Sequence, residues 1–469
     1  MGYRRFLRGE LTTSMERKNI TNTAKLVISV WNIGLFALVW YFNYNARIFN
    51  THAELAYVIS VVVYISIYLW FCNTYHAFKM ASSSVPELIF NQVISFGIAD
   101  LILYLVCCIG IHGYANIIPG IGTAILQLLG SVISIVYTKQ YFIRHIEPEK
   151  TIIVYGVKEK IPDVENFGER LVKKYKHIFD VEEVIMETDS EIELYIDRFH
   201  TIVFYEVSSE IRERLMQICC EKHKKFYYTP NLQDLINQGS SYKQLLDTPL
   251  MKYDYSYEKI KSFGAKRIMD IVFSLLFLTL LSPLILVVMI CIKAEDQGPV
   301  FYRQLRCTKD GNVFEMLKFR SMITDAEQNG VRPCMENDPR ITKVGSFIRA
   351  HRIDEIPQLI NILKGDMSFV GPRPERVEHV EQYTKEMPEF TYRMRVKGGL
   401  TGYAQIYGKY NTSAYDKLRL DLMYIENQSI IEDIKIVLLT FRVIFKKESV
   451  EGFDVKTSAM MNLQSKEGK

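Results

Sequence analysis

The sequence lacks several patterns that would each point to a familiar class of protein. Its eight cysteines include no C-x-x-C pair, and four of them fall inside apolar runs, which argues against a zinc site and a disulfide framework. No Gly-x-Gly-x-x-Gly motif follows the strand expected at 151–155, so a catalytic dinucleotide site is not indicated. A formal net charge of +4 without a basic stripe that contains aromatic residues sets nucleic acid aside as a partner.

Charge is also absent from long stretches of the chain, although its average is ordinary. Apolar residues make up 48% and charged residues 23% of the 469 residues, which excludes wholesale disorder and a small disulfide scaffold. No charged residue interrupts 26–42 or 55–72, whereas 147–266 is dense in Lys, Glu and Asp. We therefore expect a membrane protein with large soluble parts and room for roughly three domains of about 150 residues.

Four apolar segments early in the chain are expected to cross a membrane. They cover about 26–43, 55–72, 92–111 and 114–137. Each can span about 30 Å of hydrocarbon at about 1.5 Å per residue. Lys and Arg in alternate loops number ten against one, so the positive-inside rule puts the basic N-terminus, 1–25, and everything after Lys139 in the cytoplasm. No small-residue cleavage site follows the first segment, so we expect a retained anchor.

One acidic residue, Asp100, lies inside the third segment. Burying a carboxylate in a membrane is costly, so Asp100 is a candidate for a proton or substrate path. The alternative is a bundle-facing Asp that Ser or Asn from a neighbouring helix satisfies. The lack of a second charge in the other three segments favours that alternative.

A fifth apolar run, 271–292, is long enough to span a membrane but has Ser282-Pro283 at its centre. Proline removes a backbone donor and clashes with the preceding turn, and serine can bond the freed carbonyls, so the run should bend sharply. Positive charge flanks both ends and does not choose a side. A kinked spanning helix and a re-entrant hairpin that dips into one leaflet are both open interpretations of this run.

The stretch 139–258 alternates β-rich runs with polar helical runs, which is typical of a small parallel α/β domain. Strands are expected at 151–155, 184–186 and 201–205, and helices at 165–176 and 210–221. Gly156-Val157-Lys158 follows the first strand in place of the dinucleotide motif. We interpret the domain as a degenerate, Rossmann-like nucleotide-binding fold used for regulation or assembly.

The C-terminal part of the chain carries most of the candidate chemistry. Two strand-like runs flank the turn cluster 308–312 and predict a hairpin that ends in a basic pair, Lys318 and Arg320. Pro357 is tolerated only in a first helical turn, so a helix through Leu363 should begin near Asp354.

Asp354 and Glu355 would then stand at a positive helix end with Arg349, Arg352 and Arg373 close in sequence. Such an end is a candidate anion site that fits a phosphate. Two carboxylates there could divide the work of nucleophile and magnesium ligand, because hard oxygen ligands suit a metal that also binds diphosphate. The alternative is ordinary capping, with Asp at an N-cap followed by Glu, and the pair taken alone favours it.

Six ordered motifs connect this part of the chain to a known family. They are the Ser282-Pro283 break, Lys318-Phe-Arg-Ser-Met322, Asp354-Glu355-Ile-Pro-Gln-Leu, Lys364-Gly-Asp-Met-Ser-Phe-Val-Gly-Pro-Arg-Pro374, Gly399-Leu-Thr-Gly-Tyr-Ala-Gln405 and Leu420-Asp-Leu-Met-Tyr424. With them, the sequence from about Lys261 to Phe445 resembles the bacterial sugar transferases, the monotopic polyprenyl-phosphate phosphoglycosyl transferases. The preceding segments resemble, more loosely, the long form of that family, which makes exopolysaccharide or capsule primers.

The resemblance implies a fold of three parts behind the basic N-terminus. An α-helical membrane domain occupies 26–138, and the Rossmann-like α/β domain, on the cytosolic side, occupies 139–258. A mostly α, monotopic catalytic domain occupies 259–469 and contains a small β-hairpin. Its re-entrant helix breaks at Ser282 and Pro283 and keeps the catalytic domain on the cytoplasmic face.

The resemblance also implies roles for site residues. Asp354 becomes the nucleophile that attacks the β-phosphate of a nucleotide diphospho-sugar, and Glu355 becomes its partner at Mg²⁺, so both are expected metal ligands. Lys318, Arg349 and Arg373 become candidates for binding substrate phosphate.

The chain departs from the family at one position of interest. The family often has Asn-Gly-Arg after Ala-Gln, but this chain has Tyr407-Gly408-Lys409. A planar guanidinium fork is replaced by a point charge, so Lys409 is a less directional candidate for binding phosphate.

The expected function is transfer of a sugar-1-phosphate from a UDP-sugar to undecaprenyl phosphate, with release of UMP and a covalent phospho-sugar on Asp354. The long-form resemblance suggests glucose or galactose and a multi-pass protein of the bacterial inner membrane that initiates exopolysaccharide or capsule synthesis. Expected partners are the UDP-sugar, undecaprenyl phosphate, membrane lipid and downstream glycosyltransferases, with a homodimer considered and no nucleic acid.

Two rival functions are weighed against this one. An inactive membrane scaffold or nucleotide-sensing regulator would fit a chain that had lost Asp354 or Glu355, and both are present. A lipid flippase or transporter is suggested only by Asp100 and the four apolar segments, and the chain lacks the internal repeats and paired broken helices of such proteins.

Overall fold

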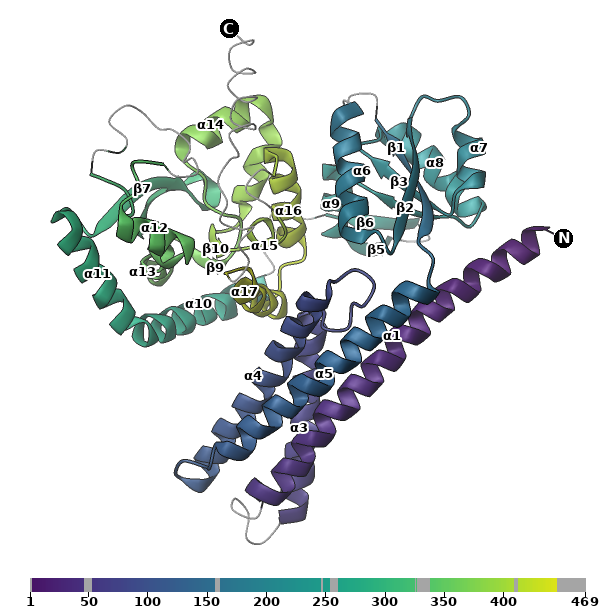
Figure 1. Cartoon of the computed structure of the whole chain (residues 1–469). Helices are drawn as coiled ribbons and strands as arrows, with labels where there is room; N and C mark the ends of the chain where they lie inside the picture. The colour runs from purple at the N-terminus through teal and green to yellow at the C-terminus, as the bar shows by residue number, and fades with distance from the viewer. Residues whose placement is uncertain are drawn as a thin grey trace. The chain divides into compact units, whose positions relative to one another are not determined.

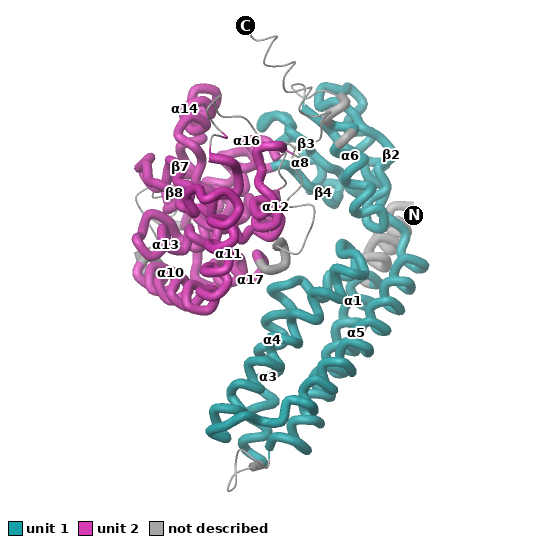
Figure 2. The backbone as a smooth tube through the Cα atoms, turned by 60° about the vertical axis from the view of Figure 1, so that its left-hand side comes forward, with its two compact units in different colours: residues 1–229 teal, residues 230–469 magenta. Residues whose placement is uncertain are grey.

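The described part of the chain is organised as two units, Met1–Thr229 and Pro230–Lys469 (Figure 2). The computed structural model describes residues 2–45, 53–156, 161–245, 248–253, 260–324, 326, 338–408 and 412–444. The first unit contains a helical bundle and a parallel sheet, and the second contains a bent helix pair and a mostly helical domain with short strands (Figure 1).

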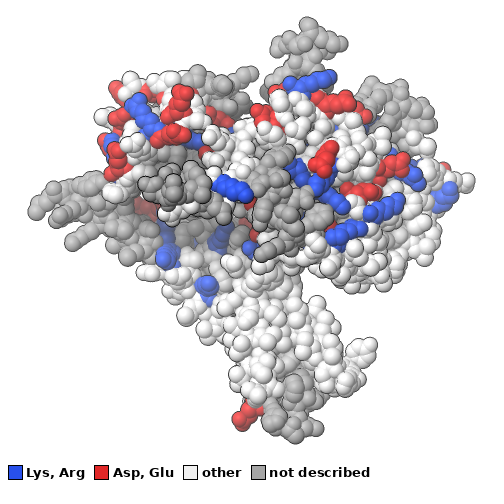
Figure 3. Space-filling model, turned by 180° about the vertical axis from the view of Figure 1, so that it is seen from behind, with Lys and Arg blue, Asp and Glu red and all other residues white. Residues whose placement is uncertain are grey.

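Four long helices form the bundle of the first unit. They are α1 (Gly2–Trp40), which continues as the π-helical turn Tyr41–Asn45, α3 (Ala53–Thr74), α4 (Val85–Ile111) and α5 (Ile118–His145). All four are long and apolar enough to cross a membrane, which confirms the four expected segments. Proline in the first turn starts both α4 and α5, where its missing N–H costs nothing. The bundle face seen in Figure 3 is almost free of Lys, Arg, Asp and Glu.

Uncharged polar side chains join the bundle helices to one another. Asn32 Nδ2 donates to Tyr68 at 3.0 Å and to Ser131 at 3.1 Å, and the Tyr68 hydroxyl donates to Gln92 at 2.9 Å. Gln127 Nε2 donates to the Tyr64 hydroxyl at 2.9 Å. These bonds satisfy groups that would otherwise be buried without water.

Asp100 lies on α4 and faces the bundle. It interacts with Tyr64 of α3 and Gln127 of α5, rather than with the Ser or Asn neighbour that was expected. Its carboxylate oxygens are buried and have no hydrogen-bond partner of standard geometry in the described residues.

A four-stranded parallel sheet completes the first unit. Its strands are β1 (Glu149–Tyr155), β2 (Phe179–Met186), β3 (Thr201–Tyr205) and β4 (Lys225–Tyr228), in the order β2-β1-β3-β4. The connecting helices are α6 (Ile161–Tyr175), α7 (Ile192–Arg198) and α8 (Ser209–Glu221). Residues 152–154 of β1 are fully buried, as a central parallel strand covered on both faces requires. The parallel α/β arrangement expected for this region is confirmed; Val157 and Lys158 lie outside the described residues.

The second unit begins before the boundary expected at residue 259. It includes α9 (Leu232–Gln238) and the hairpin of β5 (Ser241–Leu245) and β6 (Thr248–Lys252). Leu235 is fully buried in the core of this unit, and the Tyr253 hydroxyl donates to Glu426 at 3.0 Å. These contacts between segments far apart in the sequence are why composition alone did not indicate the boundary.

The fifth apolar run forms two helices, α10 (Ile260–Leu280) and α11 (Ser282–Asp296), bent by 62°. Pro283 lies in the first turn of α11, and Ser282 Oγ donates to the Thr279 carbonyl at 2.8 Å. The bend predicted at Ser282-Pro283 is therefore confirmed, and proline chemistry explains it.

Buried charged groups fasten α10 to the rest of the unit. Lys266 Nζ contacts Asp433 at 2.6 Å and the Val370 carbonyl at 2.9 Å. Asp270 accepts from the Phe369 backbone N–H at 2.9 Å, and Arg267 donates to the Ile362 carbonyl at 2.6 Å. The first half of the bent pair and the domain that follows it are thus one packed structure.

That domain is built from short elements around one core. In chain order they are β7 (Phe301–Cys307), β8 (Val313–Phe319), α12 (Lys343–Ala350), the 3₁₀ turn η3 (Ile353–Glu355), α13 (Gln358–Lys364), β9 (Ser368–Val370), α14 (Val377–Glu386), the 3₁₀ segment η4 (Pro388–Arg395), β10 (Gly399–Thr401), α15 (Tyr403–Tyr407), α16 (Ala414–Glu426) and α17 (Ile430–Ile444). Strands β7 and β8 form the predicted hairpin, and β9 pairs with β10 in parallel. Leu359, Phe369, Leu418 and Leu422 are among the residues of the core.

Candidate active site

The acid pair Asp354-Glu355 lies in the 3₁₀ turn η3, and α13 begins only at Gln358. The expectation that the helix begins near Asp354 is therefore wrong by one short turn. Arg352 has a left-handed backbone (φ +53°). Pro357 has no N–H, so it cannot donate the α-helical hydrogen bond to the carbonyl of residue 353. Side-chain cations, rather than the end of α13, must then supply most of the positive potential at these acids.

Glu355 is held firmly, whereas Asp354 is left available. Arg373 Nη2 donates to Oε1 of Glu355 at 2.5 Å, an ion pair whose side chains are 31% and 15% exposed. Within the described residues, the Asp354 carboxylate makes no hydrogen bond or close ion pair. Lys318, Arg349 and Arg373 nonetheless act on its charge. Of the two acids, Asp354 is the one free to contact a ligand.

One face of the β7–β8 hairpin points polar groups at this pair. Tyr302 lies directly opposite Lys318 in the antiparallel register, and Gln304 and Arg306 follow on the same face because side chains alternate along a strand. Positions 302, 304 and 306 are half-buried, whereas 301, 303 and 305 are exposed. Lys318 therefore belongs to a row of polar side chains rather than standing alone.

Asn361 of α13 fixes the hairpin against the helix that follows the acids. Its Oδ1 accepts from the Leu317 backbone N–H at 2.9 Å, and its Nδ2 donates to the Glu315 carbonyl at 2.8 Å. The amide thus bonds to the strand backbone on either side of position 316, and Asn361 is 1% exposed. This contact holds Lys318 close to the turn that carries Asp354.

The two acids have opposite pKa shifts. Burial and the neighbouring Glu355 raise the pKa of Asp354 to about 6. Burial also disfavours the charged form of Glu355, but Arg373 and Lys318 outweigh it and lower the pKa of Glu355 to about 2. The charged form of Glu355 is therefore favoured, whereas the charged form of Asp354 is disfavoured.

The cations of the site are crowded. Burial and the nearby Arg373 lower the pKa of Lys318 to about 8, and burial and Arg373 lower the pKa of Arg306 to about 10. Mutually repelling cations favour the arrival of an anion, which would relieve the repulsion. The site therefore suits a polyanionic ligand such as a diphosphate.

The segment 371–375 presents Arg373 to the acids. Gly371 N donates to the Thr401 carbonyl, and Gly399 N donates to the Pro372 carbonyl. A Cβ at Gly399 would lie 2.1 Å from the Gly371 nitrogen, so only glycine permits the two chains to approach this closely.

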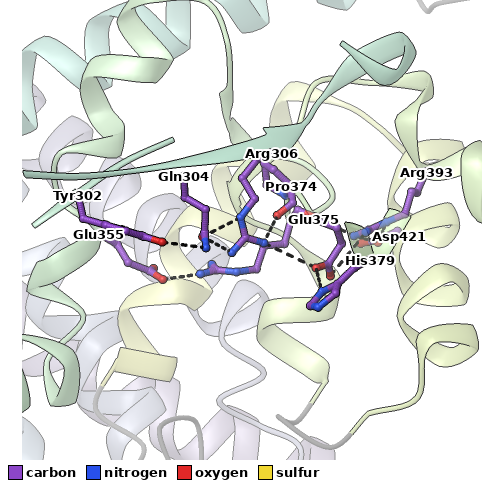
Figure 4. Close-up of polar contacts among 10 residues, drawn as sticks. Tyr302, Gln304, Arg306, Glu355, Pro374, Glu375, His379, Arg393 and Asp421 are labelled. Atoms are coloured by element: carbon purple, nitrogen blue, oxygen red, sulfur yellow. Dashed lines mark hydrogen bonds and ion pairs between the residues drawn. The ribbon is translucent and has the colours of Figure 1, made fainter. Parts of the chain in front are cut away.

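A polar network that was not identified from the sequence includes Arg306, Glu375 and Arg393 (Figure 4). Arg306 bonds to Gln304 and the Pro374 carbonyl, and Glu375 lies within 3.7 Å of Arg306 and 3.6 Å of Arg393. Alternation along the expected hairpin could have placed Arg306 beside Lys318. No local sequence pattern links Arg393 to its partner Asp421, which is 28 positions away.

The structure brings most of the residues expected at the site together. Asp354, Glu355, Lys318 and Arg373 interact with one another, and Arg349 of α12 contributes to the potential at Asp354. Lys409 lies outside the described residues. Ser282 and Pro283 are at the bend and not at the site.

Asp354 and Glu355 fit a magnesium ion that is shared with a substrate. Mg²⁺ at phosphate sites takes one or two carboxylates and completes its shell with phosphate oxygens and water. The Asp354 carboxylate is available, and Arg373 contacts Oε1 of Glu355. The described residues include no group of three or more His, Cys, Asp or Glu side chains that could hold a metal by themselves. A closed, all-protein metal site is therefore not indicated here.

Comparison with known proteins points to one family. A family model described as bacterial sugar transferase matches residues 260–447. The chain is 37% identical over 244 residues to the UDP-N-acetylgalactosamine-undecaprenyl-phosphate N-acetylgalactosaminephosphotransferase of Aeromonas hydrophila, covering 50% of this chain and 55% of that one. It is 44% identical over 180 residues to the UDP-glucose:undecaprenyl-phosphate glucose-1-phosphate transferase of Escherichia coli (strain K12), covering 37% and 39%.

A shorter relative is matched over most of its length. The uncharacterized sugar transferase EpsL of Bacillus subtilis (strain 168) is 37% identical over 186 residues, covering 40% of this chain and 90% of that one. The chain spans about half the length, or less, of the Aeromonas and Escherichia relatives. The range that the family model matches contains the bent helix pair and the acid pair.

Proposed function

We propose, because the chain belongs to the bacterial sugar transferase family, that it transfers a sugar-1-phosphate from a UDP-sugar to undecaprenyl phosphate and releases UMP. Relatives whose names state this kind of reaction are 37% and 44% identical to this chain over 244 and 180 residues, and the range of the family model contains the acid pair. The observation that carries the proposal is an Asp354 carboxylate with no hydrogen-bond partner in the described residues, next to a Glu355 that Arg373 holds. The charges of Lys318, Arg349 and Arg373 act on that carboxylate.

In the first step, an oxygen of Asp354 attacks the β-phosphorus of the UDP-sugar. An Asp–O–P bond forms, the bond from that phosphorus to the bridging oxygen breaks, and UMP leaves with the electron pair. Lys318 and Arg373 hold the phosphate oxygens and offset their charge. The fixed charge of Glu355 keeps Arg373 oriented toward the reacting phosphorus.

In the second step, a phosphate oxygen of undecaprenyl phosphate attacks the same phosphorus. The lipid diphospho-sugar forms, and the Asp354 carboxylate leaves unchanged. Mg²⁺, held by Asp354, Glu355 and the substrate phosphates, would supply further charge neutralisation when bound. A covalent intermediate suits a site that must release a water-soluble donor product before it takes a lipid acceptor.

The proposed membrane arrangement brings a water-soluble UDP-sugar and the membrane lipid undecaprenyl phosphate to the same site. A bent pair that enters one leaflet and returns would hold Asp354 near the lipid headgroups. We place the catalytic domain on the cytoplasmic face of a bacterial inner membrane, where the Lys and Arg distribution puts the N-terminus. Downstream glycosyltransferases would then extend the lipid-linked sugar into an exopolysaccharide or capsule. The proposed assembly is a homodimer.

The proposed donor carries glucose or galactose, as the long-form resemblance suggests. The two relatives named above differ in the sugar, with N-acetylgalactosamine in one name and glucose in the other. The panel of donors that tests the proposal must therefore include the UDP-activated forms of glucose, galactose and N-acetylgalactosamine.

The proposal is tested by incubating purified protein with a panel of UDP-sugars and undecaprenyl phosphate while UMP release is measured. One donor should support turnover, and that donor alone should raise the intact-protein mass by one sugar phosphate. No UMP with any donor would contradict the reaction. Turnover without a trappable adduct, together with sequential kinetics, would contradict the covalent route only.

The re-entrant arrangement has a separate test. Single reporter cysteines near Lys261 and near Asn312, introduced in a cysteine-depleted variant, should both resist an impermeant reagent applied to intact cells. Labelling of the second site from outside would favour a spanning α10–α11 pair instead.

A further inference from the structure

We propose that Arg393 and Asp421 form a positioning pair that holds the segment Pro372-Arg373-Pro374 in the shape that aims Arg373 at Glu355. The inference rests on the proposed function, in which Arg373 and Glu355 serve phosphate transfer. It adds two residues that act on the acid pair only through Arg373.

The segment depends on outside support because two of its residues are prolines, which have no N–H group. Its four consecutive carbonyls, 372–375, all accept hydrogen bonds. Backbone N–H groups serve the outer two, at 2.8 and 2.9 Å. Arginine side chains serve the inner two: Arg393 Nη2 donates to the Arg373 carbonyl at 2.9 Å and Arg306 Nη1 donates to the Pro374 carbonyl at 3.0 Å. Arg393 thus holds the backbone of the very residue that contacts Glu355.

Asp421 fixes the orientation of Arg393. Nε and Nη2 of Arg393 contact a single oxygen of Asp421, at 2.9 and 2.7 Å. Arg393 is 4% exposed and Asp421 is 1% exposed, so neither charge is screened by water. With two of its nitrogens on one oxygen, the planar guanidinium presents Nη2 to the Arg373 carbonyl in one orientation.

The two residues come from elements that have no other assigned role in the chemistry. Arg393 lies in the last turn of the 3₁₀ segment η4, and Asp421 lies in the middle of α16. Asp421 belongs to the motif 420–424, which the proposed mechanism leaves unexplained. A buried ion pair that only stabilised the fold would often be replaceable by apolar residues, whereas one that orients Arg373 would not.

The main test is a double-mutant cycle on donor kcat/KM in the full chain. Asp421→Asn should lower kcat/KM about 10–100-fold, as expected for a small misplacement of a group that binds the reacting phosphate. In an Arg373→Ala background the same change should cost less than about 2-fold, because there is no guanidinium left to misplace. Equal losses in both backgrounds would show a merely structural role and overturn the inference.

Asp416→Asn is the matched control for this cycle. It makes the same carboxylate-to-amide change on the same helix, at a side chain that is 54% exposed and paired with Arg419. It should leave kcat/KM within about 2-fold of the wild-type value in both backgrounds. Arg393→Lys is the second variant, because lysine keeps the charge but cannot contact Asp421 and the Arg373 carbonyl through a planar fork. It should follow Asp421→Asn, and wild-type kcat/KM would overturn the inference.

Hydrogen exchange of the peptide 371–376 gives a readout that needs no turnover. Exchange should be faster in Asp421→Asn and Arg393→Lys than in Asp416→Asn, at equal thermal stability of the rest of the unit. Unchanged exchange in both variants would overturn the inference even if activity fell. Absence of UMP release from the wild-type protein would instead contradict the proposed function, and hydrogen exchange alone would then decide whether the pair holds the segment.

Discussion

The helical bundle of the first unit and the domain around the acid pair both bury polar side chains, but of different kinds. In the described part of the bundle, the buried polar groups are uncharged apart from Lys139 and the carboxyl of Asp100, and hydrogen bonds such as Tyr68 to Gln92 join the helices. In the second unit most buried polar residues are charged, among them Lys266, Arg393 and Asp421. Neutral pairs cost little to desolvate, whereas buried charges cost several kcal/mol each. Buried charge is therefore concentrated in the unit that carries the acid pair.

The largest expected effect comes from removing Asp354, whose carboxylate has no hydrogen-bond or ion-pair partner among the described residues. Asp354→Asn should lower kcat at least about 10⁴-fold, because a neutral amide cannot form the phospho-sugar intermediate. Glu355→Gln should cost less, about 10²–10³-fold, since it removes an orienting charge rather than the nucleophile. UMP release and intact-protein mass measure both. Substantial turnover by Asp354→Asn would mean that the nucleophile lies elsewhere.

The next effect concerns stability and is specific to the second unit. Lys266→Met leaves Asp433 buried at 0% exposure without its cation and should lower the free energy of unfolding by about 3–5 kcal/mol. Adding Asp433→Leu should recover much of the loss, because no unpaired charge is left. Thermal transitions in lipid nanodiscs would measure the series. A double variant no more stable than Lys266→Met would contradict this account.

A third prediction concerns where the second unit begins. The fragment 230–469 should be more stable than 259–469, because the shorter one loses the buried Leu235 and the Tyr253–Glu426 bond. Loss of one buried leucine alone costs about 2–5 kcal/mol. Both fragments retain the acid pair and the bent helices, so each should release UMP wherever it is folded. Equal melting temperatures would show that 230–258 adds nothing to the unit.

The pH dependence of donor kcat/KM should be bell-shaped. Below about pH 6, where Asp354 takes up a proton, kcat/KM should fall about tenfold per pH unit because the protonated acid is not a nucleophile. Above about pH 8, where Lys318 loses its proton, kcat/KM should fall because a cation for the phosphate is lost. Lys318→Arg should move the alkaline limb upward and leave the acid limb in place. If Lys318→Arg shifted the acid limb instead, the assignment of that limb to Asp354 would be wrong.

The smallest expected effect is in the bundle. Gln92→Leu removes the acceptor of the Tyr68 hydroxyl and should lower stability by about 0.6 kcal/mol, the average for hydrogen bonds between membrane helices. Donor kcat/KM should not change. An effect as large as that of Lys266→Met would remove the contrast between the two regions.

Local patterns predicted the parts of the molecule that local chemistry determines. Runs without charge predicted the four bundle helices, and Ser282-Pro283 predicted the bend. The turn cluster 308–312 predicted the hairpin that carries Lys318. The adjacency of Asp354 and Glu355 is itself a sequence feature. These elements need no information from distant residues.

Contacts between distant residues explain what was missed. Leu235 joins the second unit because it packs beside Leu418 and Leu422, which the composition of 139–258 does not reveal. Arg306 meets Pro374 across 68 positions. The start of α13 was misplaced because the left-handed backbone at Arg352 depends on its surroundings and not on the proline rule.

The Asn361 amide has a consequence for the alignment of the hairpin. A two-stranded hairpin is only marginally stable by itself, and a slip of one residue would turn Lys318 to the opposite face. The side chain of Asn361 accepts from the Leu317 N–H and donates to the Glu315 carbonyl and to Asp366, so a strand that slides past α13 must first break both backbone bonds. It therefore acts as a register lock, and Asn361→Asp, which has no donor for the Glu315 carbonyl, would free the strand to slide.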